Sequence, residues 1–370
     1  MQEKREHLAR GKSMKDMRLR PYLGMTSKNM LIILAFSFFA ISCGTQPKAS
    51  ESSDGTRTLF PVTVNGKCGY INRDGKMVIK PAYQVADDFS EGLALVVVGD
   101  KMGYINENGE MVIQATFPGA TKFSEGMACV NMPEPDRPMK LGFINKDGDI
   151  VIEPQFYFTM GFHDGLAVVS SGEGEKRGYI DKKGKMVIPS QYDKAWDFSE
   201  GLSAVTKGGK YGYINTKGET VIKFQFETAH HFKDGLARVE ANGKYGFIDC
   251  TGTFVIPLQY TMADDFSEGL APVKIGDKWG YIDKNNNVVI NPQFDIASPF
   301  SEGMAVIGTG SYDSFKNLPK HGYIDKKGEI VVEPKFNFAD EFSGGLAHVL
   351  VNGKYGYIDK TGEYVWKPSE

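Results

Sequence analysis

Several features that would point to a function are scarce in this 370-residue chain. It has only four cysteines and six histidines, and none of their spacings matches a metal site or a disulfide framework. No Walker loop, G-x-S-x-G or H-E-x-x-H motif is present. We therefore expect no enzymatic activity, no metal and no cofactor, and we interpret Cys68, Cys129 and Cys250 as incidental strand or turn residues.

Positive charge is also scarce outside the N-terminal segment. Residues 1–28 hold eight basic and three acidic groups, and the whole chain has a formal net charge of −3. The remainder of the chain is therefore acidic, with a net charge of about −8. A nucleic-acid partner needs a cationic surface, so we expect none.

Long apolar runs are absent. The longest, residues 30–41, is shorter than the roughly 20 residues that span a bilayer. It follows a basic segment and precedes small residues, which is typical of a secretory signal. The sequence AISCG at residues 40–44 resembles the lipobox of bacterial lipoproteins, although Ala40 stands where that motif usually has Leu. The resemblance implies that Cys43 is lipidated; a plain signal with an incidental cysteine is the alternative.

These features divide the chain into three parts. Residues 1–42 form the signal region, within which a true start at Met25 would exclude residues 1–24. Residues 43–56 form the lipidated cysteine and a polar, flexible tether. Residues 57–370 form the body. We expect a membrane attachment through the lipid anchor, in the cell envelope of a bacterium, at its outer membrane or cell surface.

What the body does contain is one phrase, repeated. A triplet of Gly, an aromatic residue and Ile begins at Gly69, Gly103, Gly142, Gly178, Gly212, Gly246, Gly280, Gly322 and Gly356. A second phrase, FSEGLA or a near form, begins at Phe89, Phe123, Phe162, Phe198, Phe232, Phe266, Phe300 and Phe342. Each second phrase begins 20 residues after a triplet glycine, whereas successive triplets are 34 to 42 residues apart. All length variation therefore lies between a second phrase and the next triplet.

One repeat predicts three short strands, which we call first, middle and last. In GLARVEANGKYGFIDCTGTFVIP, Asn242-Gly243 is a strong hairpin signal between the first two strands. The next turn has Asp or Asn first and Gly fourth in nearly every copy, so that a side chain caps the turn and Gly takes the left-handed position, which Asn286 takes once. We expect the triplet glycine to make room for a neighbouring aromatic ring, and prolines such as Pro81 to end the pairing of the last strand.

The fold is therefore predicted to be all-β. The body starts and ends with a complete meander, which gives nine three-stranded antiparallel sheets of about 34 residues and eight linkers. Propellers usually close by completing the last sheet with the first strand, and nothing in this sequence requires that. We favour an open β superhelix or solenoid, with a closed propeller-like ring as the alternative.

The pattern K-[YW]-G-[YF]-I-[DN]-x-x-G-x-x-V-I-x-P, followed by F-S-E-G-L-A, resembles the WG repeat family, also called KWG repeats. The resemblance covers about residues 57–370. The tryptophan that names the repeat survives only as Trp279, and other residue types fill that slot elsewhere. The resemblance implies a β repeat in an exported protein and implies no common activity.

The best catalytic candidates are the acids of the second phrase: Glu91, Glu125, Asp164, Glu200, Asp234, Glu268 and Glu302. Paired carboxylates can act as acid and base, but an active site needs one arrangement with distinct environments. Seven equal copies indicate a structural turn instead.

Recognition of a partner is the function that remains. Insertions at residues 131–140, 170–177 and 308–321 all lie between first and middle strands, and Tyr312 and Phe315 in the longest could anchor a protein partner. A glycan or cell-wall binder is an alternative, in which Tyr211, Tyr245, Trp279 and Tyr355 stack sugar rings. Burial of these four aromatics would exclude that ladder, and we expect them in the core. A structural spacer without a ligand is the third possibility.

Overall fold

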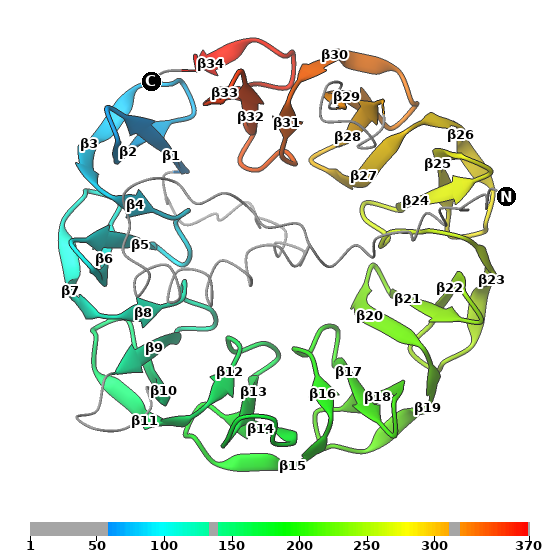
Figure 1. Ribbon diagram of the computed structural model, residues 1–370, viewed down its shortest axis with the longest axis horizontal. Coiled ribbons are helices and arrows are strands. Elements are labelled where there is room, and N and C mark those ends of the chain that lie inside the picture. Colours follow the sequence, from blue (N-terminus) through cyan, green and yellow to red (C-terminus); the bar gives the residue numbers. More distant parts are fainter. Residues whose placement is uncertain (1–57, 133–139, 311–318, 369–370) are drawn as a thin grey trace, which may run out of the picture. The chain divides into compact units, whose positions relative to one another are not determined.

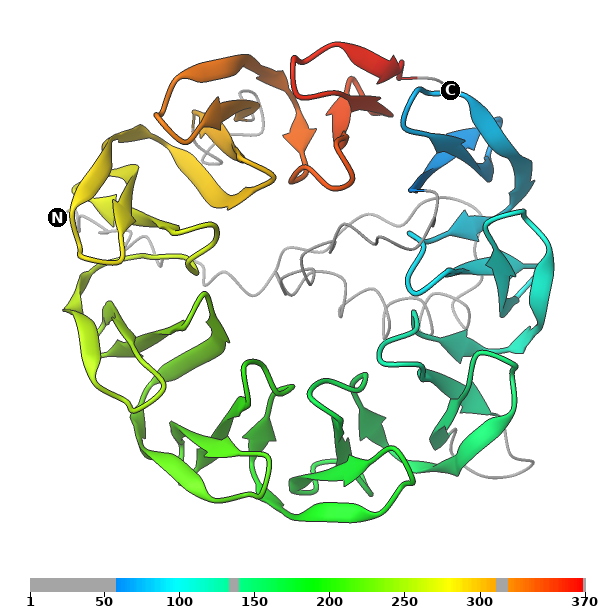
Figure 2. The same cartoon turned by 180° about the vertical axis from the view of Figure 1, so that it is seen from behind.

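The computed structural model describes residues 58–132, 140–310 and 319–368. The chain divides into two compact units, residues 1–46 and 47–370, and every described residue belongs to the second. This unit contains nine antiparallel sheets, which stand side by side in a closed ring (Figures 1 and 2). We number these sheets as blades 1 to 9 in chain order.

Within a complete blade, four strands follow one another from the ring centre outward, and we call them inner, first, middle and last. The inner strands are β4 (Val85–Ala86), β8 (Gly119–Ala120), β12 (Phe158–Thr159), β16 (Lys194–Ala195), β20 (Thr228–Lys233), β27 (Ile296–Ser301) and β31 (Phe338–Ala339). The first strands are β1 (Leu59–Val64), β5 (Leu93–Val98), β9 (Ala128–Met132), β13 (Leu166–Ser170), β17 (Leu202–Lys207), β21 (Leu236–Ala241), β24 (Leu270–Ile275), β28 (Met304–Thr309) and β32 (Ala347–Val351).

The other two strands of each blade complete the meander predicted from the repeat. The middle strands are β2 (Lys67–Asn72), β6 (Lys101–Asn106), β10 (Lys140–Ile144), β14 (Arg177–Asp181), β18 (Lys210–Asn215), β22 (Lys244–Ile248), β25 (Lys278–Asp283), β29 (Lys320–Asp325) and β33 (Lys354–Ile358). The last strands are β3 (Met77–Tyr83), β7 (Met111–Phe117), β11 (Ile150–Phe156), β15 (Met186–Tyr192), β19 (Thr220–Phe226), β23 (Phe254–Tyr260), β26 (Val288–Phe294), β30 (Ile330–Phe336) and β34 (Tyr364–Trp366).

The inner strand shows that the expectation of purely three-stranded sheets is wrong. The segment read as a linker forms a fourth strand in seven blades. In blade 7 it makes a single bridge, between Ala263 and Val273, and in blade 1 the described residues include no inner strand. Five of the inner strands are only two residues long, and two residues are too few to show the alternation of apolar and polar positions that identifies a strand.

The triplet glycine is required by the backbone of the last strand. In blade 1 the register between β2 and β3 shifts, and pairing continues beyond the shift to Cys68 and Tyr83. A Cβ at Gly69 would lie only 2.5 Å from the carbonyl oxygen of Ile79. The expectation that an aromatic ring fills this space is therefore wrong. Pro81 also lies within β3, at the bulge, and does not end the pairing.

The turn between middle and last strands has the predicted chemistry. In blade 1 the Asn72 side-chain oxygen accepts hydrogen bonds from the backbone N–H groups of Asp74, at 3.1 Å, and Lys76, at 2.8 Å. Gly75 has a φ of 76° in this turn, and Asn286 has a φ of 66° where it replaces glycine in blade 7. The side-chain cap and the left-handed fourth position are thus confirmed.

Neighbouring blades are joined by a repeated aromatic pair. The triplet aromatic of one blade packs on the phenylalanine of the next blade's second phrase, with ring centroids 4.8 to 5.0 Å apart from Tyr70–Phe89 to Tyr323–Phe342. The Tyr70 hydroxyl also donates a hydrogen bond to the carbonyl of Asp87, at 2.7 Å. This contact explains the constant spacing of 20 residues, because a fixed length of chain is needed to bring the phenylalanine of one blade onto the triplet aromatic of the blade before it.

A similar contact, with a phenylalanine of first strand β1 in place of the second-phrase phenylalanine, closes the ring between blades 9 and 1, at a junction that we call the seam. Tyr357 packs on Phe60, with ring centroids 5.5 Å apart, and its hydroxyl donates to the carbonyl of Pro61 at 3.0 Å. Phe60, Val62 and Leu346 are buried in one cluster there. The favoured open superhelix is therefore wrong, and the alternative of a closed propeller-like ring is confirmed. Closure needs no strand of blade 1 to complete the sheet of blade 9, because side-chain packing between the two blades closes the ring.

The one departure from the acid of the second phrase also lies at the seam. Gly344 stands where seven linkers have Glu or Asp, and its φ is 60°. A Cβ there would lie 2.5 Å from the Thr58 methyl group. The start of blade 1 therefore occupies the space that an acidic side chain takes at the other junctions.

Two simpler expectations concern cysteines and membrane spans. Cys68, Cys129 and Cys250 are free thiols, as the sequence indicated. Within residues 58–132, 140–310 and 319–368, no helix has the length and apolar character needed to cross a membrane.

Candidate functional site

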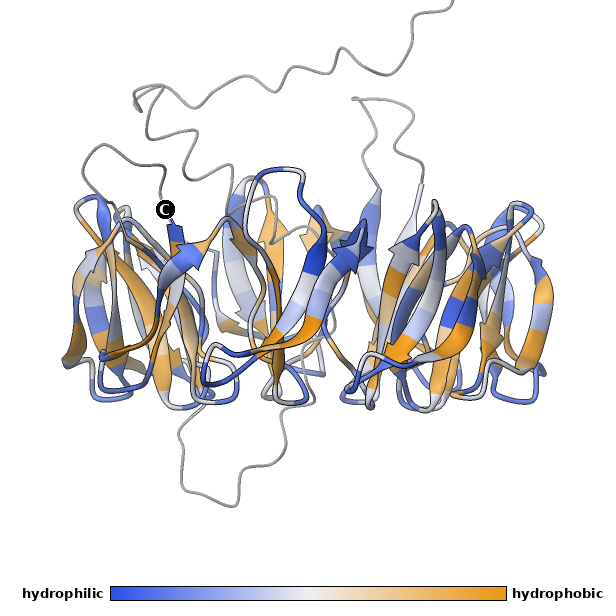
Figure 3. Ribbon diagram, turned by 90° about the horizontal axis from the view of Figure 1, so that it is seen from below, coloured by the Kyte–Doolittle hydropathy of each residue, from blue (hydrophilic) through white to orange (hydrophobic). Residues whose placement is uncertain are grey.

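The ring has two rims because its strands run alternately in opposite directions (Figure 3). The latch rim carries the Ser-Glu-Gly turns and the turns between middle and last strands. The hairpin rim carries the hairpins between first and middle strands and the connections from each last strand to the next blade. Hydrophilic residues gather at both rims, and the strands between them are mostly apolar.

The repeated acids of the second phrase join neighbouring blades at the latch rim. All seven have a positive φ, between 50° and 56°. Each carboxylate accepts a hydrogen bond from a glycine N–H of the next blade, at 2.8 to 3.1 Å: Glu91 from Gly126, Glu125 from Gly165, Asp164 from Gly201, Glu200 from Gly235, Asp234 from Gly269, Glu268 from Gly303 and Glu302 from Gly345.

Lysines of the next blade contact four of these carboxylates, at 3.1 to 3.3 Å: Lys146 with Glu91, Lys182 with Glu125, Lys326 with Glu268 and Lys360 with Glu302. These lysines are well exposed, so each ion pair contributes only about 0–1 kcal/mol. The acids therefore serve as contacts between blades, which agrees with their interpretation as structural turns.

A second set of carboxyl groups, which the sequence reasoning missed, lies at the ring centre. They precede the phenylalanine of the second phrase and include Asp87, Asp88, Asp197, Asp264 and Glu341. Burial raises the pKa of each, with neighbouring carboxylates adding to the effect at Asp87. The side chains of Asp87, Asp88 and Glu341 still reach solvent, so these shifts affect stability little. A signal in the sequence could have found them: the two positions before that phenylalanine vary between blades, whereas the phrase that follows is constant.

Asp197 is the most perturbed of these groups. Its side chain is 17% exposed, and burial raises its pKa to about 7. One carboxylate oxygen lies 3.7 Å from Nε2 of His163, and the other is buried without a hydrogen-bond partner. Burial also lowers the pKa of His163, so burial disfavours the charged form of both partners.

The adjacent histidines point to different neighbours, as expected for consecutive residues of a strand. His230 contacts Arg238, with Nδ1 and Nη2 3.2 Å apart, whereas the ring of His231 packs on Trp196. Burial, followed by the charge of Arg238, lowers the pKa of His230 to about 4. Among the described residues no group of three His, Cys, Asp or Glu side chains is placed to hold a metal ion.

The strands that flank all three insertions end at the hairpin rim. The insertions connect β9 to β10, β13 to β14 and β28 to β29, which are first and middle strands of blades 3, 4 and 8. Tyr312 and Phe315, the candidate anchors for a protein partner, lie outside the described residues, as does Cys43. The structure thus fixes the rim from which the insertions leave.

The four aromatics of the sugar-stacking alternative lie at the starts of middle strands, near this rim. Tyr211, Tyr245 and Trp279 are half-buried, and each packs against a cluster that joins its own blade to the next. Tyr355 is 51% exposed and stacks on His348, with ring centroids 4.5 Å apart. The first three therefore lie partly between blades, and Tyr355 is the most exposed of the four. Sugar stacking stays a prediction.

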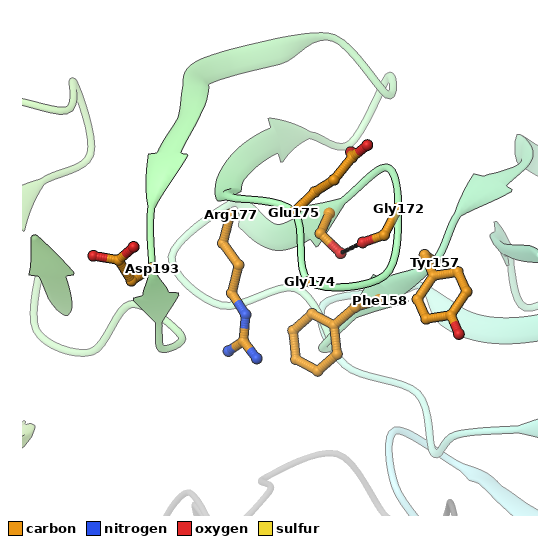
Figure 4. Close-up of a pocket in the computed structure, with 8 residues that line it drawn as sticks. Tyr157, Phe158, Gly172, Gly174, Glu175, Arg177 and Asp193 are labelled. Carbon is orange, nitrogen blue, oxygen red and sulfur yellow. Dashed lines mark hydrogen bonds between the residues drawn. The ribbon is translucent and has the colours of Figure 1, made fainter.

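A depression of about 250 Å³ lies at the hairpin rim of blade 4 (Figure 4). Arg177, in the slot that gives the repeat its tryptophan, lies beside Phe158 there, with its guanidinium carbon 4.1 Å from the ring centroid. Tyr157, Glu175 and Asp193 also line it. A second depression of about 330 Å³ lies between blades 6 and 7.

Comparison with known families identifies the repeat. The sequence model of the family described as WG containing repeat matches residues 69–101, 102–132, 142–173, 178–211, 211–245, 245–279, 279–310 and 322–355. A search of curated proteins gives no match.

Solved structures match this chain at low identity. The crystal structure of a eukaryotic initiation factor matches with a TM-score of 0.59 and 13% identity, over 84% of this chain and 94% of that chain. Hsv2 of Kluyveromyces lactis matches with a TM-score of 0.41 and 9% identity, over 66% and 95%. A streptogramin B lyase matches with a TM-score of 0.32 and 14% identity, over 65% and 91%. Only the first likeness is strong enough to use, and it bears on the fold alone.

Proposed function

We propose that this chain, which belongs to the family of WG repeat proteins, is a membrane-anchored, non-catalytic scaffold whose hairpin rim binds a protein partner. The anchor in this proposal is a lipidated Cys43, which would hold the ring at the bacterial cell envelope, at the outer membrane or the cell surface.

The observation that carries the proposal is how constant and variable residues are distributed. The constant residues of the repeat serve the fold: aromatics join neighbouring blades, acids cap glycine N–H groups, and triplet glycines admit a backbone. The length changes all fall at the hairpin rim. A rigid fold whose contacts between blades are constant, and whose loops vary in length on one rim, is typical of a recognition surface.

The proposal is tested by a pull-down from cell-envelope extract with residues 47–370. One variant replaces residues 310–319 by Asn-Gly, the turn that residues 242–243 form in blade 6. A matched control changes Lys327→Ser, an exposed position on the latch rim of the same blade. We expect the loop variant, but not the control, to lose a partner. Equal recovery of every partner by all three proteins would reject the hairpin rim.

The anchor is tested separately. Labelled palmitate should enter the native chain and be absent from a Cys43→Ala variant. Labelling that survives this change would reject the lipoprotein assignment while leaving the binding rim to its own test.

A further inference from the structure

Arg177 is a charge at a position where the repeat otherwise uses packing residues. The equivalent residue before each triplet glycine is Cys, Met, Leu, Tyr, Trp or His in the other blades. In blade 4 the guanidinium group is half-buried, and burial lowers its pKa. A cation that has lost water needs an anion or several acceptors in exchange.

The acids around Arg177 are committed elsewhere. Asp193 forms an ion pair with Lys176, and Glu173 forms a hydrogen bond with Tyr157 that raises the pKa of that tyrosine. Figure 4 shows the carboxylates of Asp193 and Glu175 pointing away from the guanidinium group. Arg177 keeps one hydrogen bond, from Nη1 to the carbonyl oxygen of Ala195 at 3.2 Å, and no carboxylate of the described residues forms an ion pair with it.

The space beside Arg177 is the size of a side chain. The depression of about 250 Å³ is below the roughly 300–1,000 Å³ of pockets that hold drug-sized ligands. Its wall combines the guanidinium group with the rings of Tyr157 and Phe158. The hydroxyl group of Ser170, which also lines the depression, donates a hydrogen bond to the Gly172 carbonyl, at 3.2 Å. A planar anion with a small apolar body matches this lining.

We propose that this depression binds a carboxylate, with the free N–H groups of Arg177 as its donors. A guanidinium group offers parallel N–H donors that fit the two oxygens of a carboxylate. The carboxylate could belong to an acidic side chain of the protein partner or to a free small carboxylic acid. The first source rests on the proposed function, because it makes Arg177 a contact of the hairpin rim.

The test is a titration of residues 47–370 with benzoate, followed at the arginine Nε–H resonances by NMR. This unit has only five arginines, so the Arg177 resonance can be assigned with one substitution. We expect benzoate to shift that resonance and the isosteric neutral amide, benzamide, to leave it unchanged. Arg177→Gln should weaken benzoate binding by at least about tenfold, because charge-assisted hydrogen bonds are lost. Lys183→Gln removes the same charge from an exposed position on the latch rim of the same blade and should leave binding unchanged.

The pull-down then separates the two sources of the carboxylate. Loss of the partner in Arg177→Gln but not in Lys183→Gln would identify an acidic side chain of that partner. Benzoate binding without any captured partner would keep the carboxylate site and reject the scaffold proposal. An Arg177 resonance that ignores benzoate, or that responds equally to benzamide, would overturn the inference.

Discussion

The seam provides the sharpest test of the closed ring, through the substitution Phe60→Ala. Phe60 is 6% exposed and packs on Tyr357, whose hydroxyl donates to the carbonyl of Pro61. Truncating a buried phenylalanine to alanine costs about 3–5 kcal/mol. Among the described residues, no strand of blade 1 pairs with a strand of blade 9. The seam is therefore held by side-chain contacts, and we expect Phe60→Ala to weaken these contacts enough to open the ring.

A matched substitution within the ring separates opening from simple destabilisation. Phe266 is 1% exposed and packs on Phe247, with ring centroids 4.8 Å apart. Phe266→Ala removes the same atoms from an equivalent contact, but the blades on either side stay tethered by the chain. Both variants should lower the free energy of unfolding by similar amounts, and only Phe60→Ala should open the ring.

The assay combines urea denaturation with a distance across the seam. Spin labels at Thr63 in blade 1 and Asn352 in blade 9 occupy exposed positions, once Cys68 and Cys250 are replaced by serine. We expect one narrow distance distribution in the native ring and in Phe266→Ala, and a broad, longer one in Phe60→Ala. A broad distribution in the native protein, or a Phe60→Ala variant that loses less than about 1 kcal/mol with unchanged distances, would refute closure by packing.

Three further predictions concern the joints, the bulges and the ring centre. Glu268→Gln should lower the free energy of unfolding by about 1 kcal/mol in urea denaturation, because the Gly303 N–H loses a charged acceptor; no change would show that this latch is unimportant. Gly212→Ala places a Cβ 2.6 Å from a backbone oxygen and should lower the free energy of unfolding by at least about 3 kcal/mol. Gly209→Ala, at a φ of 78° in open space, should lower it by only about 1–2 kcal/mol. Equal losses of stability in the two variants would contradict the steric explanation. Asp197 has a folded-state pKa of about 7, above its unfolded value of about 3.9, so the folded state binds the extra proton and the contribution of this group to stability should rise as pH falls from about 8 to 4. Asp197→Asn should flatten that rise in thermal melts across this pH range, and an unchanged pH profile would reject the assignment.

Local chemistry made much of the fold readable from the sequence. The Asx-capped turn depends on residues three positions apart, so Asn72 and Gly75 identify it without knowledge of the fold. Asn286 confirmed it by replacing glycine with the residue next most tolerant of a positive φ. The fixed distance between the two phrases likewise predicted a rigid unit, although not that the unit spans two blades.

Closure could not be read in the same way. It depends on Phe60 meeting Tyr357 across nearly the whole body, and Phe60 looks like any apolar strand residue. Gly344 was the only local sign, because it breaks the acidic pattern at the junction that the chain itself does not span. The acids at the ring centre were missed for a related reason: burial there results from the ring, and no local pattern shows it.

Differences between blades are a better guide to function in this protein than the repeated motif. A residue that is repeated for the joints between blades, such as Glu268, is already satisfied by a neighbouring blade. The positions that change are the pair before the second phrase, the slot before the triplet glycine and the hairpin between first and middle strands, and they lie at the ring centre and the hairpin rim. Arg177 combines two of these, since it fills a variable slot at the end of an insertion. A ligand that distinguishes one blade from another has to contact such positions, because the constant ones look alike from every blade.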